Sequence, residues 1–333
     1  MNSTELDHLF RTKTRREIFY LEHPGTESPS YKNMEKKQIN GKNVLLFKLP
    51  ALKEAEILIR KDSRFTDVPL YIHSNLNMNF IYSGKQDYVI NNHSITLQKG
   101  DVAIFDKDVV RRKLYAGEED IVINISMSNE FFSNSFLQQV RNQSIISNFL
   151  LHLLSDRSDT HNHYMIFRTR ENTTISTLFY QLFSEYYGNG IYRKEMIQGY
   201  LQLIFIELLR TYHEDASNQL VQISSGQMQN TFDILHYIER HYADCTLTQL
   251  ADEFGYHPKY LCSLLKKQTG RTFKEIQLSQ RLKAAAALLA DTDDPIQTVF
   301  QKVGAANQNF FYKYFETYYH MSPNEYRAKS RPN

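Results

Sequence analysis

Cysteine is scarce in this chain, which has 333 residues and only two thiols, Cys245 and Cys262. Two thiols cannot build a disulfide framework, and neither belongs to a motif with the ligand spacing of a metal site. Long apolar runs are also missing, because Glu207 interrupts the longest one, from Leu201 to Leu209. A membrane span needs roughly 18–20 apolar residues. The N-terminal residues lack the apolar region of an export signal. These absences predict a cytoplasmic protein with no membrane partner and no metal site.

Motifs of catalysis are absent as well. The sequence has no nucleophile elbow, glycine-rich phosphate loop or paired acid motif. We therefore expect no catalytic residues, no cofactor and no enzymatic activity. The remaining composition is that of an ordinary globular protein, with 41% hydrophobic and 23% charged residues. A chain of this length predicts about two domains, each with its own core.

The first domain has β-rich and helical parts. Short strand-like runs separated by turn residues occupy residues 65–127, and they predict a small antiparallel barrel or sandwich. These runs are residues 78–82, 88–90, 94–97, 102–105 and 121–126. From about 129 to 214 the apolar period becomes helical. Two long helical stretches flank Gly188–Gly190 and predict an α-hairpin, which either fills the core or provides a self-association surface. Residues 215–229 lose the pattern and are expected to be a linker.

A helix-turn-helix pattern begins at Leu247. Such a unit needs a small residue where its helices cross, a turn residue that tolerates positive φ, and an apolar seam. Ala251 and Gly255 meet the first two demands. The seam is predicted to consist of Leu250, Phe254, Leu261 and Leu264.

The pattern returns further along, with Gly304 lying 49 residues after Gly255. Its seam is predicted to be Val299, Val303, Phe311 and Phe315. Phe300 stands where a small residue is expected, so either the crossing is wider or the ring turns into the core. The interval from the turn glycine to the first seam residue of the second helix is one residue longer than in the first copy.

The ends of the helices carry capping signals. Thr246 with Gln249, Thr272 with Glu275, and Ser322 with Glu325 have the spacing of capping boxes, and Asp294 before Pro295 predicts a further cap. The Ala- and Leu-rich stretch 273–290 predicts a continuous helix of roughly 27 Å between the two units. A rod of that length can hold two helices in successive major grooves, which lie about 34 Å apart.

Positive charge is concentrated in the same region, although the net charge of the chain is only +2. Residues 257–283 contain one acid, Glu275, and seven bases: Lys259, Lys266, Lys267, Arg271, Lys274, Arg281 and Lys283. A basic surface at a helix-turn-helix favours binding to the phosphates of nucleic acid.

Residues 230–330 resemble the DNA-binding domain of the AraC/XylS family of bacterial transcription regulators. The residues that carry the resemblance are 250–256 (LADEFGY), 264–270 (LLKKQTG), 281–285 (RLKAA) and the segment from Phe315 to Arg327. The resemblance implies seven helices, of which the third and the sixth enter the major groove. It implies a sequence-specific regulator that reads two adjacent major-groove segments with the helices at about 258–268 and 307–319. It also implies a nucleoid-associated bacterial protein that acts as an activator, with RNA polymerase as a partner.

The resemblance carries DNA-contacting roles onto individual positions. The expected base contacts are Gln308, Asn309, Phe310 and Lys313 in the sixth helix, with His257, Lys259, Cys262 and Ser263 at the third. Gln and Asn suit adenine, Lys suits guanine, and Phe310 can touch a thymine methyl group. The expected backbone contacts are Thr246, Lys266, Lys267, Arg271, Arg281, Lys283, Asn307 and Arg327. Because Cys262 and Ser263 are short, the third helix is expected to contribute mostly backbone or apolar contacts.

The β-rich half resembles the cupin-like domains that bind an effector or mediate dimerisation in this family. His73 is present, but Asn75, Asn77 and Arg111 stand where metal-binding cupins have further ligands, so no metal is expected. Tyr71, His73, Tyr82 and Arg111 are our candidates for the effector pocket, since aromatics and one cation suit a sugar or another polar metabolite.

The expected chain is therefore α+β. A cupin-like β-barrel with a helical dimerisation hairpin spans residues 1–214, a linker spans 215–229, and an all-α domain with two helix-turn-helix units spans 230–330. The leading hypothesis is an effector-responsive, homodimeric regulator that binds double-stranded DNA. Two alternatives stay open: a cupin enzyme with a helical appendage, and a regulator whose N-terminal half docks only another protein.

Overall fold

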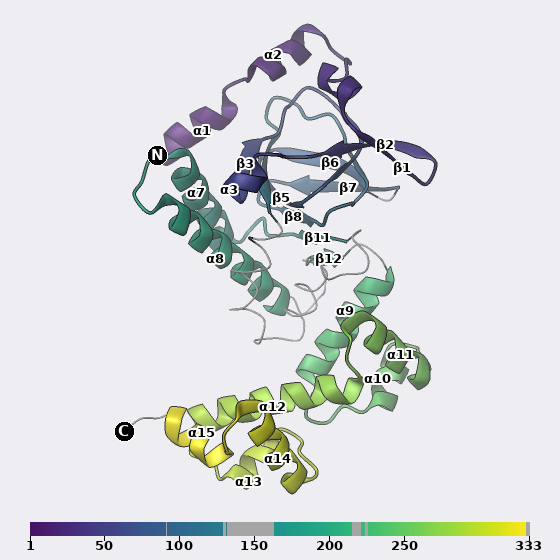
Figure 1. Cartoon of the computed structure of the whole chain (residues 1–333), viewed down its shortest axis with the longest axis vertical. Helices are drawn as coiled ribbons and strands as arrows, with labels where there is room; N and C mark the ends of the chain where they lie inside the picture. The colour runs from purple at the N-terminus through teal and green to yellow at the C-terminus, as the bar shows by residue number, and fades with distance from the viewer. Residues whose placement is uncertain (91, 129–130, 132–162, 215–220, 224–225, 331–333) are drawn as a thin grey trace. The chain divides into compact units, whose positions relative to one another are not determined.

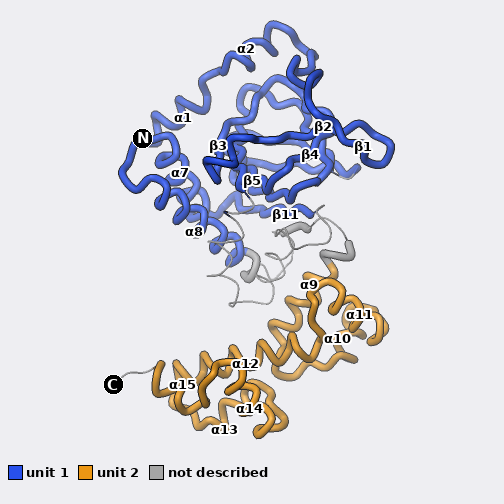
Figure 2. Tube along the Cα trace, in the orientation of Figure 1, with its two compact units in different colours: residues 1–141, 150–225 blue, residues 142–149, 226–333 orange. Residues whose placement is uncertain are grey.

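The computed structural model describes the chain except residues 91, 129–130, 132–162, 215–220, 224–225 and 331–333. The described residues form two compact units (Figure 2). The first unit ends at Ile223 and the second begins at Gly226. No described helix is both long and apolar enough to cross a bilayer.

Two six-stranded sheets make up the centre of the first unit (Figure 1). One has the order β1-β2-β4-β9-β6-β7, and its pairs are antiparallel except β2 with β4. Its strands are β1 (Lys36–Ile39), β2 (Lys42–Phe47), β4 (Val68–His73), β6 (Lys85–Ile90), β7 (His93–Gln98) and β9 (Arg111–Lys113). The other has the antiparallel order β12-β11-β8-β5-β10-β3. Its strands are β3 (Ile57–Lys61), β5 (Leu76–Ser83), β8 (Val102–Phe105), β10 (Ile121–Met127), β11 (Tyr164–Phe167) and β12 (Val221–Ile223).

The two sheets share one apolar core. Tyr88 and Leu97 of the first sheet pack with Ile81 and Phe105 of the second, and all four side chains are fully buried. Successive side chains of β5 point to opposite faces of its sheet, and this strand is buried on both because the first sheet covers one face and a helix covers the other. On its other face, Phe80 stacks on a helix that covers the second sheet.

That helix belongs to a hairpin of α7 (Thr173–Tyr187) and α8 (Arg193–Glu214) (Figure 1). The ring of Phe179 in α7 lies 4.1 Å from that of Phe80, measured between centroids. The apolar stripe of α7 is thus part of the core of its own unit. The unit also contains α1 (Ser3–Arg11), α2 (Arg15–Glu22), a 3-10 helix (Pro29–Asn33) and α3 (Leu52–Ala55).

The structure confirms the five strands and the α-hairpin that the sequence predicts, but it differs elsewhere. The described strands form two sheets and no closed barrel. Strand β11 lies inside the region expected to be helical, because its four buried residues are short enough to suit either structure and pair with β8 and β12. Strand β12 and the first residues of α9 occupy part of the 215–229 segment expected to be a linker.

The described residues of the second unit form seven helices, the number that the family resemblance implies. They are α9 (Gly226–Arg240), α10 (Leu247–Glu253), α11 (Pro258–Thr269), α12 (Phe273–Asp291), α13 (Ile296–Lys302), α14 (Gln308–Tyr319) and α15 (Pro323–Ser330). The pair α10 and α11 forms the first helix-turn-helix, α13 and α14 form the second, and α12 joins them (Figure 1).

The predicted capping boxes are present at Thr246, Thr272 and Ser322. Each hydroxyl accepts a hydrogen bond from the backbone N–H three residues later, while the Gln or Glu there accepts one from the cap's own N–H. The cap predicted at Asp294 is wrong. Its carboxylate instead accepts hydrogen bonds from Lys302 and Thr292, and Pro295 precedes α13 without a side-chain cap.

Candidate nucleic-acid interface

The first helix-turn-helix closes as its sequence predicts. Gly255 has φ +66° in the turn, and the N–H of Tyr256 donates to the carbonyl of Ala251 at 2.8 Å. Ala251, Leu261 and Leu264 are buried at the crossing. Phe254 is only half-buried and contacts Tyr237 of α9 edge-on. The seam therefore extends to α9 and fixes α11 against two helices.

The second helix-turn-helix repeats this geometry around a larger residue. Gly304 has φ +76°, and the N–H of Ala305 donates to the carbonyl of Phe300 at 2.9 Å. The ring of Phe300 is 2% exposed and packs edge-on against Phe311 at 4.8 Å. Of the two alternatives for Phe300, the structure shows that the ring turns into the core.

The two helix-turn-helix units touch directly. A Cβ atom on Gly304 would lie 1.8 Å from the carbonyl oxygen of Ala243, which belongs to the loop between α9 and α10. The same carbonyl accepts a hydrogen bond from Arg281 of α12, whose Nε also donates to Tyr242. Gln277 of α12 donates to the carbonyls of Tyr242 and Cys245. These contacts hold α11 and α14 in one fixed arrangement.

The outward face of α14 combines polar and aromatic groups. Asn309, Phe310, Lys313 and Tyr314 are exposed, whereas Phe311 and Phe315 are buried on the opposite face. Phe310 is 53% exposed and its ring lies 4.3 Å from that of Tyr314. Gln308 is the first residue of the helix and is partly exposed. All four base-contact candidates of this helix therefore reach the surface at its N-terminal half.

The outward face of α11 carries basic side chains together with the short side chains of Cys262 and Ser263. Lys259, Ser263, Lys266 and Lys267 are exposed, while Cys262 is only partly so. His257 precedes the helix, and its Nδ1 accepts a hydrogen bond from the N–H of Lys259 at 3.3 Å. It thus caps α11 through a side-chain acceptor, the role that Ser, Thr, Asp and Asn commonly have at this position.

The candidates for backbone contact fall into two groups. Lys266, Lys267 and Arg271 are exposed and near the end of α11. Arg281, Lys283 and Arg327 are partly buried, and both arginines donate to backbone carbonyls inside the unit. Burial lowers the pKa of Arg281 and of Lys283. The structure therefore gives the arginines of this group a role in packing that the sequence did not reveal.

Thr246 lies at the N-terminus of α10, and Asn307 lies at the N-terminus of α14. Each side-chain oxygen accepts a hydrogen bond from a backbone N–H of its own helix, Thr246 from Gln249 and Asn307 from Phe310. Both residues are exposed. Sequence reasoning missed two exposed aromatics, Tyr260 of α11 and Tyr314 of α14, because a tyrosine at helical spacing is more often part of a core.

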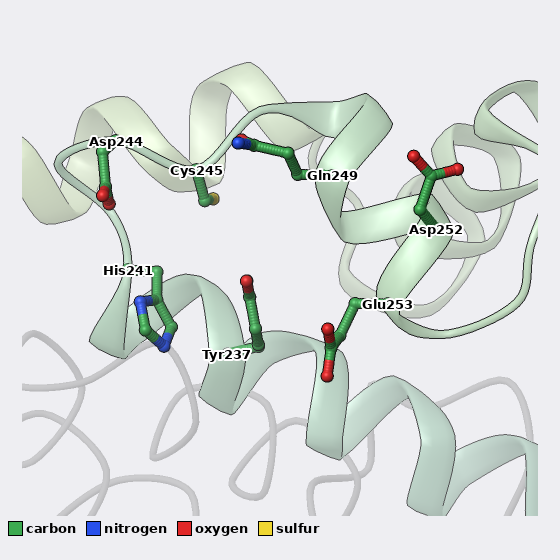
Figure 3. A pocket seen from close by; sticks show the side chains of 7 residues that line it. All are labelled: Tyr237, His241, Asp244, Cys245, Gln249, Asp252 and Glu253. Carbon is green, nitrogen blue, oxygen red and sulfur yellow. The ribbon is translucent and has the colours of Figure 1, made fainter.

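A hollow of about 500 Å³ lies on the α9–α10 side of the first helix-turn-helix (Figure 3). Asp244, Asp252 and Glu253 contribute carboxylates to its wall, beside His241 and Tyr237. Negative charge there disfavours the phosphates of DNA. The basic surface of α11 is therefore the better face of this unit for DNA.

Three of the four effector candidates lie together in the first unit. Arg111 donates from Nε to the hydroxyl of Tyr71 at 3.1 Å, and the rings of Tyr71 and His73 are 5.6 Å apart. Tyr82 lies elsewhere, beside Asp7 and Tyr180 at a smaller hollow of about 370 Å³. Its separation follows from strand alternation, since Tyr82 lies on the face of β5 that α7 covers.

Comparisons with known proteins agree with the helix-turn-helix geometry. A family model described as a helix-turn-helix domain matches residues 250–329. The uncharacterised HTH-type transcriptional regulator YtdP of Bacillus subtilis is 31% identical over 110 residues, which are 32% of this chain and 14% of that protein. The raffinose operon transcriptional regulatory protein RafR of Pediococcus pentosaceus is 23% identical over 252 residues, covering 75% of this chain and 83% of that protein.

Among solved structures, an apo ToxT variant from Vibrio cholerae aligns with a TM-score of 0.35 and 16% identity, over 82% of this chain and 97% of that chain. The helix-turn-helix match and the curated relatives identify the family that the residues of the second unit resemble. The chain is a DNA-binding transcription regulator, and its second unit is a helix-turn-helix domain of the AraC type.

Proposed function

We propose that this regulator reads an operator in double-stranded DNA with α11 and α14 in two adjacent major-groove segments. The observation that carries the proposal is the direct contact between Gly304 and the α9–α10 loop, which fixes the spacing of the two helices. A pair of helices held at constant separation can enter successive grooves without paying the entropy of ordering a flexible joint.

In this proposal the two helices have different tasks. Helix α14 supplies base recognition: Gln308 and Asn309 form paired hydrogen bonds with adenine, Lys313 donates to guanine, and Phe310 contacts a thymine methyl group. Helix α11 supplies chiefly phosphate contacts through Lys266 and Lys267, with Arg271 beside them.

The remaining contact candidates have subordinate roles. Lys259, Cys262 and Ser263 add short contacts to bases, and His257 adds one from the start of α11. Thr246 and Asn307 face the DNA backbone at helix ends. Arg281, Lys283 and Arg327 support this surface from within the unit and hold the two reading helices in position, because the donors of both arginines are directed at carbonyls.

The first unit is proposed to be a cupin-like sensing and dimerisation domain joined by the 215–229 segment. One face of α8 supports the dimer, since Met196, Leu203 and Ile206 recur at helical spacing and are between 38% and 49% exposed. Exposed apolar side chains in register on one helix are typical of a self-association surface. A relative that aligns with 75% of the chain is named for the raffinose operon, which supports a small polar effector.

Effector binding in the first unit would then change how the second unit binds DNA, and an activator of this kind would contact RNA polymerase at the promoter. The cluster of Tyr71, His73 and Arg111 is our proposed effector pocket, and Tyr82 is no longer grouped with it. The protein is proposed to act in the bacterial cytoplasm, on the nucleoid.

The test is a selection of bound duplexes from a random DNA library by the full-length protein, followed by gel retardation. The expected result is a motif with two conserved blocks, whose binding changes when a panel of sugars and polar metabolites is added. Enrichment of no sequence would overturn the proposal of specific reading. Binding that is indifferent to every compound, with a motif still present, would favour an N-terminal half that contacts only proteins.

A further inference from the structure

Arg111 is the largest unexplained group inside the first unit. Its side chain, on strand β9, is fully buried. The guanidinium lies over the ring of Phe105 at 4.2 Å and over that of Tyr71 at 4.6 Å. Its hydrogen bonds go to neutral acceptors: the Tyr71 hydroxyl at 3.1 Å, the Asn77 amide oxygen at 3.1 Å and the Val109 carbonyl at 3.3 Å.

Two other buried cations of this unit, Arg64 and Lys113, have the carboxylate partner that Arg111 lacks in the part of the chain that the structure describes. Arg64 donates to the carboxylate of Glu17 at 2.8 Å, and Lys113 lies 3.1 Å from the carboxylate of Asp62. Both side chains are under 4% exposed. Among the described residues, no carboxylate forms an ion pair with Arg111. A buried charge without a counter-charge is costly, so its presence calls for an explanation.

Arg111 is bordered by buried or half-buried polar side chains, where a protein core usually has apolar ones. Asn77 and Asn79 of β5 point to the same face of their sheet as Asn124 and Ser126 of β10, and these groups hydrogen-bond to one another. Asn79 also donates to Tyr88, and Asn77 accepts from Arg111. The buried interface between the sheets thus has an apolar part, around Phe105, and a polar part, around Arg111.

Two buried polar atoms near the β4–β5 connection have no hydrogen-bond partner among the residues that the structure describes: Nδ1 of His73, the last residue of β4, and Oδ1 of Asn75, which directly precedes β5. His73 is 7% exposed and Asn75 is 5% exposed. Burial, reinforced by the nearby Arg111, lowers the pKa of His73 well below its usual value, which favours the neutral ring, a donor at one nitrogen and an acceptor at the other. An unpaired buried polar atom calls for a partner, and a bound ligand is one way to supply it.

The polar part reaches solvent at the edge of the second sheet. Asn124 is partly exposed, although its neighbours in β10 are buried. It pairs with Arg60 of the edge strand β3, whose side chain is exposed. Paired residues on neighbouring antiparallel strands share a face. Asn124 is therefore the member of the network that solvent reaches, and the exposed Arg60 lies beside it on the neighbouring strand.

We propose that the effector of this regulator is a small organic anion, a metabolite with a carboxylate or phosphate group, held between the sheets by Arg111, His73 and the asparagine network. This inference rests on the effector-responsive function proposed above and specifies the chemistry of its ligand. The oxyanion takes the place of the Asn77 amide oxygen on Arg111, because a charged acceptor binds guanidinium more strongly than a neutral one. Hydroxyl groups of the ligand pair with Asn75 and Asn124.

The test uses the full-length protein and follows thermal unfolding with citrate, D-glucuronate, D-glucose 6-phosphate and inorganic phosphate as probes. D-Glucose and NaCl at matched ionic strength are the controls. We expect at least one organic anion to raise the melting temperature by about 5 °C at a concentration well above its Kd, and glucose to leave it unchanged. If no anion stabilises the protein more than glucose and NaCl do, the proposal is overturned.

Two arginines on β9 give a matched pair of variants. Arg111→Met removes the buried charge while keeping much of the volume, so the ligand-free protein should melt within a few degrees of the wild type and lose the response to anions. Arg112→Met changes the next residue, which faces solvent and pairs with Asp67 at 3.0 Å, and should keep the response. A response that survives Arg111→Met overturns the proposal.

If Arg111→Met does not fold, Arg111→Lys replaces it, since the lysine keeps the charge but loses the planar fork of donors. A smaller or absent anion response in this variant supports the proposal, and an undiminished one overturns it. Gel retardation of DNA by the same samples distinguishes a failure of the anionic ligand from a failure of the effector-responsive function. If only neutral compounds alter DNA binding, the effector-responsive function holds and the anionic ligand is excluded. If the protein selects no DNA sequence, the function proposed above fails on its own account.

Discussion

The two helix-turn-helix units of this regulator share one backbone design but differ in what surrounds it. In the first, Gly255 turns in open space and Ala251 leaves room at the crossing. In the second, Gly304 lies against the Ala243 carbonyl of the α9–α10 loop, and Phe300 fills the crossing. The first helix-turn-helix thus presents a basic face on α11, and the second presents exposed polar and aromatic side chains on α14. In the proposed function, this difference divides phosphate binding and base recognition between the two copies of one motif.

The largest expected effect comes from the two turn glycines. Gly304→Ala places a methyl group against the Ala243 carbonyl at a positive φ, so we expect it to lower the free energy of unfolding by about 3–5 kcal/mol. Gly255→Ala has the same backbone strain but nothing within 4 Å, and should cost only about 1–2 kcal/mol. Urea unfolding followed by circular dichroism measures both. Equal losses of unfolding free energy would mean that Gly304 is not in tight contact with the α9–α10 loop.

The next effect concerns base reading by α14. Gln308→Ala and Asn309→Ala should each cost about 1–3 kcal/mol of binding free energy on the selected operator and relax the base preference at one position. Ser263→Ala on the outward face of α11 is the control and should change neither. Titration by fluorescence anisotropy with the selected duplex and single-base variants gives the comparison. An unchanged sequence preference in both α14 variants would remove the base-contact assignment.

The helix caps offer a smaller contrast. Thr246 caps α10 through a complete capping box, so Thr246→Ala should destabilise the protein by about 1 kcal/mol. Asp294 near the start of α13 makes only partly exposed contacts with Lys302 and Thr292, and Asp294→Ala should cost about 0.5 kcal/mol or less. The midpoints of urea unfolding of the two variants, measured side by side, compare the two losses of stability. A larger loss at Asp294 would show that its contacts, and not the geometry of a cap, stabilise α13.

The smallest effect is electrostatic. Lys267 is exposed on α11, and Lys267→Ala should weaken binding to all sequences alike while reducing the salt slope of the association constant by about one. Measurements of Kd at several salt concentrations, on the operator and on an unrelated duplex, provide the slope. A loss confined to the operator would instead make Lys267 a base-reading residue.

Much of the second unit was predictable because its signals are local. The glycine of each turn, the small or apolar residue at each crossing, and the three capping boxes depend on residues only a few positions apart. The same is true of the outward position of Lys313 and of the burial of Phe311, which follow from helical spacing. These features are encoded by short-range geometry, so one sequence suffices to find them.

What escaped prediction depends on contacts distant in sequence. Arg281 resembles a phosphate-binding residue until the structure shows that it donates to carbonyls 38 and 39 residues away. The run Arg111–Lys113 has no apolar alternation, yet it forms strand β9 because β4 and β6 pair with it on either side. Charge and hydropathy describe a side chain without revealing its partners, and the effector pocket was for that reason predicted only in part.

The central claim is that one chain holds two reading helices at a fixed spacing on one face of the duplex. Hydroxyl-radical and guanine-methylation footprinting of the full-length protein on its selected operator tests it most directly. The account predicts, for each bound chain, two protected major-groove patches about 10 base pairs apart on the same face. It also predicts that Asn309→Ala alters the pattern in only one of them. A single patch for each chain, or two patches on opposite faces, would contradict it.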